Sequence, residues 1–254
     1  MLLSEGLEII ERSLKKGKFH CLIDYLSNEC SITLEKYNGD IEYEIKLDYI
    51  GEKKDLNEAF SFLREQLSKQ AFFIDSIGRY SDYDVEYFSN GEEELSLFVY
   101  ENEPLLKLKK HKNIDYNGQK IFCNEENFEY DSSNIKKILF SDNVQHLASM
   151  NKKRVKDFLI CKKNLIIYAS AFTLCEINGK VQLQYELEYY RHIPVENVQV
   201  DEELILNQLS QICNLISKDS NNTFVPGSEL KCAFAKRYYS ANKTKQDAVN
   251  CFFE

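Results

Sequence analysis

Ile41-Glu42-Tyr43-Glu44-Ile45-Lys46-Leu47 and Leu183-Gln184-Tyr185-Glu186-Leu187-Glu188-Tyr189 are the two stretches that decide the fold of this chain of 254 residues. In both, charged or polar residues alternate with large apolar ones at a period of two, which is the period of a β-strand. The acids and the lysine of the first stretch therefore share one face, and so do the two acids of the second. Either stretch alone is typical of an ordinary half-exposed strand. Brought together on one interior surface, their carboxylates would make an oxygen-rich site suited to Mg²⁺ or Mn²⁺ beside a phosphate.

Basic strands are predicted between the two acidic ones. Lys107 and Lys109 fall on one face of a strand, and Arg154 and Lys156 share a face of another. Residues 105 to 163 contain 13 lysines and arginines against 7 aspartates and glutamates, although the whole chain has a net charge of -9. The negative total disfavours a surface that coats nucleic acid, whereas the local positive charge favours a focused anion site. A solvated face remains the alternative for each lysine alone.

The rest of the pattern predicts a strand-rich fold. Helices are expected at residues 3–14, 19–26, 55–69 with Asp55 as N-cap, and 200–217. Further strands are expected at residues 79–88, 94–100, 105–110, 120–130, 153–161, 165–175 and 181–190, with hairpin turns at Asn90-Gly91 and Asn178-Gly179. So many antiparallel strands are expected to close into a barrel or sandwich, because open sheet edges are a liability.

Composition narrows the class of protein. Three prolines and nine glycines leave no linker, so we expect a single domain over residues 1–254. The eight cysteines stand singly without a CxxC pair, which disfavours zinc and favours reduced thiols, with disulfides formally open. No apolar stretch reaches the ~20 residues of a membrane span. We therefore expect an intracellular, cytoplasmic or nuclear protein without a membrane partner. Walker, GxSxG and HExxH motifs are absent.

Four motifs in order resemble the triphosphate tunnel metalloenzyme (CYTH-like) superfamily. They are the ExExK strand at 42–46, LKLKK at 106–110, KKR at 152–154 and YELEY at 185–189. The superfamily includes CYTH phosphatases and the metal-dependent RNA 5′-triphosphatases of fungal, protozoan and viral capping systems. Residues 223–240 are most similar to the triphosphatase domain of the baculovirus late expression factor type of capping enzyme. The resemblance implies an α+β, strand-rich fold: a closed antiparallel eight-stranded β-barrel with flanking helices.

The resemblance also implies a site and a division of the chain. Residues 1–35 would be an N-terminal helical extension, 36–240 the tunnel domain and 241–254 a C-terminal tail. Mg²⁺ or Mn²⁺ would be held by Glu42, Glu44, Glu186 and Glu188. The catalytic carboxylates would be these four residues and Glu125. Glu125 or Glu188 would orient the attacking water. The triphosphate would be held by Lys46, Lys107, Lys109, Arg154, Lys156, Lys236 and Arg237.

The function implied is removal of the γ-phosphate of an RNA 5′-triphosphate in mRNA cap formation, with a guanylyltransferase or an RNA polymerase subunit as partner. One alternative is a CYTH-type hydrolase or cyclase acting on inorganic triphosphate, thiamine triphosphate or ATP. Another is a catalytically inactive tunnel-fold binding or assembly subunit. The sequence departs from the family pattern in having no acid at residues 166–170 and in placing Gln182 and Gln184 where a basic residue is common. It also lacks the KxDG lysine of a nucleotidyltransferase.

Overall fold

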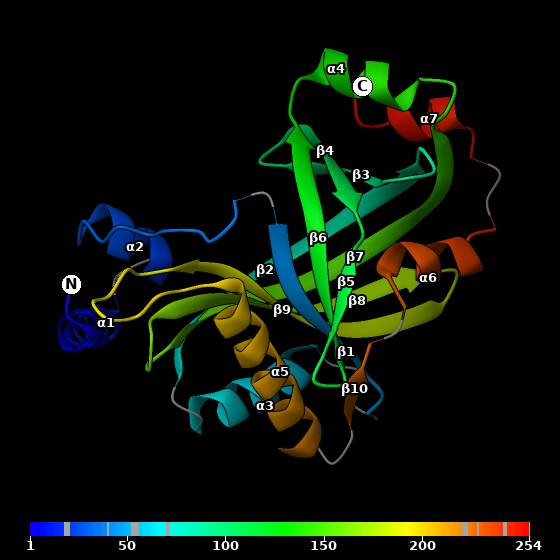
Figure 1. Cartoon of the computed structure of the whole chain (residues 1–254). Helices are drawn as coiled ribbons and strands as arrows, with labels where there is room; N and C mark the ends of the chain where they lie inside the picture. Colours follow the sequence, from blue (N-terminus) through cyan, green and yellow to red (C-terminus); the bar gives the residue numbers. More distant parts are fainter. Residues whose placement is uncertain are drawn as a thin grey trace.

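The computed structural model describes residues 1–17, 21–39, 41–51, 56–69, 72–219, 223–227, 229–240 and 243–253, and it is built around one antiparallel sheet (Figure 1). The strands of this sheet are β1 (Ile41–Tyr49), β2 (Phe72–Ser89), β3 (Glu94–Tyr100), β4 (Glu103–Lys110), β5 (Asn113–Tyr116), β6 (Gln119–Glu129), β7 (Gln145–Cys161), β8 (Ile166–Ile177), β9 (Lys180–His192) and β10 (Phe224–Pro226). They are hydrogen-bonded in the order β10-β1-β9-β8-β7-β2-β3-β4-β6-β5, and β1 also pairs with β6. That last pairing closes a ring of eight strands, with β5 and β10 outside it. The closed eight-stranded barrel expected from the sequence is thus confirmed.

The register of the strands decides which side chains face the barrel interior. Glu44 lies opposite Glu188, and Lys46 lies opposite Glu186, across β1 and β9. Glu42 lies opposite Asn124 across β1 and β6. The apolar residues between them point the other way. The polar faces of the acidic strands therefore line the interior of the barrel.

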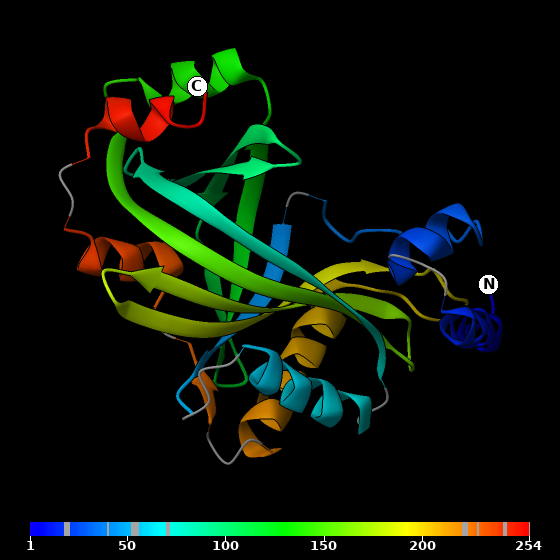
Figure 2. The ribbon, with the colours of Figure 1, turned by 180° about the vertical axis from the view of Figure 1, so that it is seen from behind.

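The main hydrophobic core lies outside the barrel wall. Helices α3 (Leu56–Lys69) and α5 (Glu202–Asp219) cover the outer faces of β1, β8 and β9 (Figure 2). Fully buried residues such as Tyr43, Leu187 and Leu209 belong to this core. Both acidic strands therefore bury their apolar faces under helices and turn their charges inward. This arrangement explains how strands with so many charges can lie in the centre of the molecule.

The other helices cover the two ends and one side of the barrel. Helices α1 (Leu3–Lys16) and α2 (Leu22–Asn28) pack together at one end. Helices α4 (Ser132–Leu139) and α7 (Lys245–Asn250) cover the outer faces of β2, β3 and β4, where Ala248 and Val249 are fully buried. Phe19 and Asp55, which were predicted to begin two helices, lie outside the described residues. The division of the chain at residues 35 and 240 stays a prediction.

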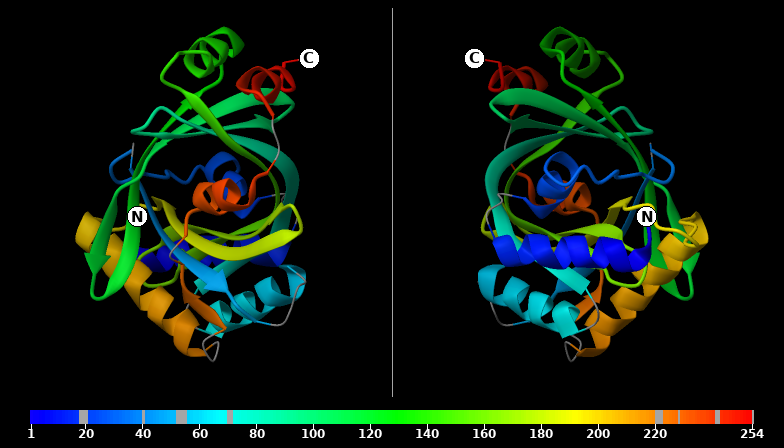
Figure 3. Two further views of the ribbon diagram at one scale, coloured as in Figure 1. Left: turned by 90° about the vertical axis from the view of Figure 1, so that its right-hand side faces the viewer. Right: turned by 90° about the vertical axis from the view of Figure 1, so that its left-hand side faces the viewer.

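Helix α6 (Lys231–Tyr238) lies across one end of the barrel (Figure 3, left). Its Cys232, Phe234 and Ala235 are buried against Tyr87 and Cys175, which the strand register directs into the barrel. Apolar side chains therefore fill this end. The sequence predicted only a basic segment here and not a helix that closes the barrel.

The two hairpin turns agree with the expectation from the sequence. Asn178 and Gly179 both have positive φ angles, 48° and 71°, which the tight β8–β9 hairpin requires. Asn90 begins the β2–β3 turn, where its Oδ1 accepts hydrogen bonds from the backbone of Glu92 and Glu93. None of the helices in the described residues has the length and apolar character needed to cross a membrane.

Candidate functional site

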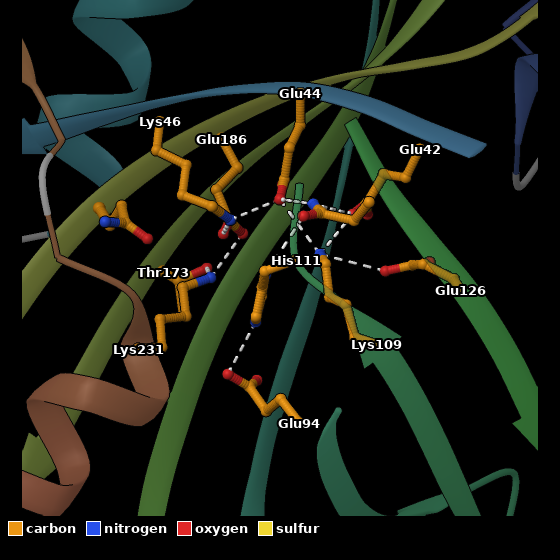
Figure 4. Close-up of polar contacts among 12 residues, drawn as sticks. Glu42, Glu44, Lys46, Glu94, Lys109, His111, Glu126, Thr173, Glu186 and Lys231 are labelled. Carbon is orange, nitrogen blue, oxygen red and sulfur yellow. Dashed lines mark hydrogen bonds and ion pairs between the residues drawn. The ribbon is translucent and has the colours of Figure 1, made fainter. Parts of the chain in front are cut away.

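Carboxylates and lysines alternate in the interior, where β1, β4 and β9 face one another (Figure 4). Lys46 Nζ lies 2.7 Å from Glu44 Oε1 and 2.8 Å from Glu186 Oε1. Lys109 Nζ lies 3.1 Å from the same Glu44 oxygen and also contacts Glu42. Glu44 thus joins the two lysines. All five of these residues are buried.

An amide supports the two carboxylates of β1. Asn124 Nδ2 donates to Glu42 Oε2 at 3.0 Å and to Glu44 Oε1 at 2.9 Å. Its Oδ1 lies 3.2 Å from His111 Nδ1, and His111 Nε2 lies 3.0 Å from a carboxylate oxygen of Glu94. Because a buried carboxylate needs several donors, this fixed amide orients both glutamates toward the interior.

The ion pairs keep two of these acids charged despite their burial. Burial raises the pKa of Glu42, but Lys109 and the lysines beyond it outweigh that effect and hold the pKa well below its usual range. Burial is likewise outweighed at Glu186, whose pKa is held low by Lys231, Lys46 and Arg154. Both residues are therefore carboxylates at neutral pH.

Glu188 differs from the other acids of the barrel. It makes no side-chain hydrogen bond or ion pair within the described part of the chain. Burial and the negative charge of Glu42 raise its pKa to about 7. Lys156 and Lys107 lower this pKa but do not reverse the shift, and no cation of the described residues lies within ion-pair distance of Glu188. The acidic cluster, defined here as Glu42, Glu44, Glu126, Glu186 and Glu188, therefore has an unsatisfied member.

Across the barrel from the acidic cluster, β7 carries three cations at a period of two. We call Lys152, Arg154 and Lys156 the β7 cation row. Arg154 Nη2 lies 3.9 Å from Glu186 Oε2, and its buried Nε has no hydrogen-bond partner among the residues that the structure describes. No ion pair of Lys152 or Lys156 occurs within the described residues. Burial and Arg154 lower the pKa of Lys156 to about 8. Lys152 and Lys156 instead lie over aromatic rings, and Glu188 acts on Lys156 only without direct contact, so the row is only partly neutralised by the described residues.

Helix α6 adds a cation from outside the barrel wall. Lys231 Nζ donates to Glu186 Oε2 and, at 3.2 Å, to Thr173 Oγ1 of β8 (Figure 4). Burial lowers the pKa of Lys231 to about 8, although Glu186 acts in the opposite direction. Lys231 therefore neutralises Glu186 at the end of the interior that α6 closes.

Three residues expected in the site lie elsewhere. Glu125 is exposed because β6 directs its neighbour Glu126 inward, where Glu126 pairs with Lys107 and Lys109. Lys236 and Arg237 are exposed on α6, and Arg237 instead pairs with Glu229 at 2.8 Å. These three assignments are corrected on that ground. The other predicted residues do face the interior: Glu42, Glu44, Lys46, Lys107, Lys109, Arg154, Lys156, Glu186 and Glu188.

Sequence reasoning missed several interior residues. Asn124, Glu126, Lys152 and Lys231 all line the interior, and none was selected beforehand. Of these, Lys152 could have been found, since it precedes Arg154 by two residues and lies one residue before the strand predicted at 153–161. The residues of β8 that face the acidic cluster are Ala169, Ala171 and Thr173, so the departure noted in the sequence holds: this wall carries no acid.

The donor chemistry of the acidic cluster suits a divalent cation, but the present arrangement does not gather the donors. Within the described residues, no three acidic, cysteine or histidine side chains lie close enough to hold a metal ion. The reason is that Lys46 and Lys109 stand between the carboxylates. Hard carboxylate oxygens are nevertheless what Mg²⁺ and Mn²⁺ prefer, and Glu188 makes no direct ion pair with any described residue. Glu42, Glu44, Glu186 and Glu188 would hold such an ion once the lysines turn toward an anionic ligand.

Lys109 should be a strong determinant of stability. Replacing it by methionine roughly keeps the length of the side chain but leaves Glu42, Glu44 and Glu126 with less counter-charge in the interior. We expect the free energy of unfolding to fall by about 3 kcal/mol, the effect of removing one partner of a buried ion pair. Urea denaturation measures it. Lys110→Met is the matched control on the exposed face of β4, and a loss there equal to that at Lys109 would contradict the burial argument.

Comparisons with known proteins concern the fold. No protein-family model matches the sequence, and no curated protein matches it. Similar solved structures include HpAC1 from Hippeastrum, reported with a dominant triphosphatase activity, at 12% identity over 79% of this chain and 98% of that one, with a TM-score of 0.43. A candidate adenylate cyclase of Bacillus halodurans matches at 12% identity over 79% of this chain and 100% of that one, with a TM-score of 0.43. The RNA triphosphatase Pct1 of S. pombe, solved with the Spt5 CTD, matches at 12% identity over 82% and 90%, with a TM-score of 0.37. None of the three is a viral capping enzyme, and that nearer kinship stays a prediction.

Proposed function

We propose that this chain is a metal-dependent triphosphatase that removes the γ-phosphate from the 5′-triphosphate end of RNA. The observation that supports the proposal is the opposition of two charged walls inside a closed barrel. In the described residues, the β7 cation row has only one ion pair, that of Arg154 with Glu186 at 3.9 Å, and the acidic cluster lies across from it. The negative charge of an oligophosphate neutralises the first wall, and a divalent cation neutralises the second. A metal–triphosphate complex therefore complements the charges of both walls.

The residues have separable roles in this proposal. Arg154 binds phosphate oxygens through two parallel hydrogen bonds, and Lys152 and Lys156 act as point charges beside it. Lys46, Lys107 and Lys109 exchange their carboxylate partners for phosphate oxygens as the substrate enters. Glu188, which makes no direct ion pair among the described residues, accepts a proton from the attacking water, and a pKa of about 7 suits a general base. Mg²⁺ or Mn²⁺ held by the acidic cluster would withdraw charge from the γ-phosphate.

The product of this reaction is an RNA with a 5′-diphosphate end. Such an end is the acceptor that guanylylation requires, so we expect a guanylyltransferase, or a polymerase complex that carries one, to act on the product. The proposal applies to nascent mRNA in cap formation, and the viral capping enzymes of the late expression factor type remain the nearest relatives we expect. The alternative substrates that the same two walls would bind are inorganic triphosphate, thiamine triphosphate and ATP.

A binding subunit without chemistry is the second candidate function. The observation that favours it is the wall of β8, where Ala169, Ala171 and Thr173 offer no carboxylate to a metal. A barrel of this kind would still hold a triphosphate through the β7 cation row. It would differ from the triphosphatase only in turnover, so a measurement of turnover separates the two.

Phosphate release with and without a divalent ion tests the proposal. We expect the chain to release inorganic phosphate from a 5′-triphosphorylated oligoribonucleotide in Mn²⁺ or Mg²⁺, and to fall to the buffer rate in excess EDTA. Inorganic tripolyphosphate and ATP are assayed in parallel to rank the substrates. Binding of the oligoribonucleotide without any phosphate release in either metal would favour the binding subunit. Faster turnover of tripolyphosphate than of RNA would favour the CYTH-type alternative.

A further inference from the structure

An aromatic pair continues the interior face of β6 beyond the acidic cluster. The side chains of Asn124, Glu126 and Phe128 follow one another at a period of two, and Tyr130 comes directly after the strand. Phe128 is 46% exposed and Tyr130 is 65% exposed, although both are large apolar rings. Their ring centroids lie 6.5 Å apart with the planes inclined at 32°. Two exposed rings held side by side at this small inclination form a largely apolar surface, which soluble proteins seldom expose without a use.

This aromatic pair lies directly next to the residues that would hold phosphate. Phe128 is opposite Lys107 in the pairing of β4 and β6, and Lys107 Nζ lies 5.6 Å from the centroid of the Phe128 ring. Lys107 in turn pairs with Glu126 and lies 3.9 Å from Glu42. A phosphate bound at Lys107 would therefore be a near neighbour of the Phe128 ring.

The aromatic pair also lies at the end of the barrel away from α6. Contacts order the interior from α6 outward: Lys231 contacts Glu186, Glu186 contacts Lys46, and Lys46 contacts Glu44. Lys109 continues the series from Glu44 to Glu42 and Glu126, and Lys107 ends it beside Phe128. Apolar side chains of α6 fill the first end. We therefore expect a group attached to a bound triphosphate to leave at the other end, which the aromatic pair shares with α1 and α2.

We propose that Phe128 and Tyr130 are the stacking platform for the first base of a 5′-triphosphorylated RNA. This inference rests on the proposed function, because it assumes that the triphosphate lies along Lys107 and the β7 cation row. Single-stranded RNA is commonly recognised by stacking its bases on exposed aromatic rings beside basic residues. Both features occur here on adjacent strands. Tripolyphosphate has no base, so the platform distinguishes an RNA end from the free anion.

A single tryptophan tests the platform without relying on turnover. The chain contains no tryptophan, so Phe128→Trp places one fluorophore in the platform. In excess EDTA, we expect a triphosphorylated oligoribonucleotide to quench its emission and saturating tripolyphosphate to leave it nearly unchanged. Tyr80→Trp is the matched control: Tyr80 is 61% exposed and points away from the interior, opposite Val155 of the outer core. Quenching at position 80 equal to that at position 128, or equal quenching by tripolyphosphate, would overturn the platform.

Kinetics give a second, independent readout. Phe128→Ala is expected to raise the KM for triphosphorylated RNA about tenfold, the typical loss of one stacked base, with a much smaller change in kcat. If RNA is hydrolysed but the tryptophan and the KM do not respond, the platform is wrong and the proposed function stands. If the tryptophan is quenched by RNA but no phosphate is released, the platform stands and the proposed hydrolysis is wrong.

Discussion

Replacing Glu44 by glutamine is expected to reduce metal-dependent phosphate release by about 1,000-fold, the upper range for removing one preorganised charged contact to a transition state. Glu44 joins Lys46, Lys109 and Asn124, so it touches both the proposed metal ligands and the lysines that would turn toward phosphate. Glutamine keeps the volume and can still accept a hydrogen bond from Asn124. It removes only the negative charge, which a divalent cation requires.

Glutamine is a better choice than alanine at this position. Glu44 contacts the ammonium groups of both Lys46 and Lys109, so alanine would leave a cavity and remove a charge partner from two buried lysines. Rates are measured at saturating Mn²⁺, and circular dichroism and urea unfolding confirm that the variant is folded. Glu176→Gln, an exposed acid on β8, is the control. A folded Glu44→Gln protein with undiminished turnover would remove β1 from the mechanism.

The acidic strands were predictable because their alternation is unambiguous. In β1, every second residue from Tyr43 to Leu47 is apolar, so only one assignment of faces buries the apolar set. The same holds for β9 around Glu186. Closure of the barrel followed from the number of antiparallel strands and from the resemblance. The position of these carboxylates in the interior was thus within reach of sequence reasoning.

β6 was not predictable to the same degree. Glu125 and Glu126 are adjacent, with an asparagine on either side of the pair, so the local pattern does not determine which of the two faces inward. The pairing of Glu126 with Lys109 of β4 decides it, and that pairing joins strands separated by a further hairpin. When tertiary contacts set the register, the sequence of the strand alone does not show which residues face inward. For this reason the sequence analysis selected Glu125 instead of Glu126.

Lys231 illustrates a second limit. Its side chain enters the barrel from helix α6, which is not part of the barrel wall. The alternation of residues in the strands therefore could not reveal it. The sequence did mark a basic segment, but it favoured Lys236 and Arg237. Those residues lie more than one turn further along α6 and are exposed, while Phe234 packs against the barrel. Helix packing, rather than charge, selects the lysine that reaches Glu186.

Reversing the charge at Arg154 is expected to weaken the binding of tripolyphosphate by at least about a hundredfold. A charge-assisted hydrogen bond contributes about 1.5–3 kcal/mol, and Arg154→Glu replaces such bonds with repulsion. Arg154 is suited to this role because its buried Nε has no partner and its nearest carboxylate oxygen, on Glu186, is 3.9 Å away. The guanidinium therefore loses few existing hydrogen bonds or close ion pairs when it binds a phosphate. Calorimetry in excess EDTA measures the affinity without hydrolysis.

Lys218→Glu is the matched control for this charge reversal, because Lys218 is exposed on α5 outside the barrel wall. It changes the net charge of the protein by the same amount, so any general electrostatic effect on a polyanion appears equally in both variants. Screening by added salt should remove the small loss at position 218 but not the large one at position 154, since buried charges are screened less. Equal and small losses at the two positions would mean that the β7 cation row does not hold phosphate. A barrel that binds but does not hydrolyse would still show the large loss at Arg154, so this measurement establishes the anion site independently of the chemistry.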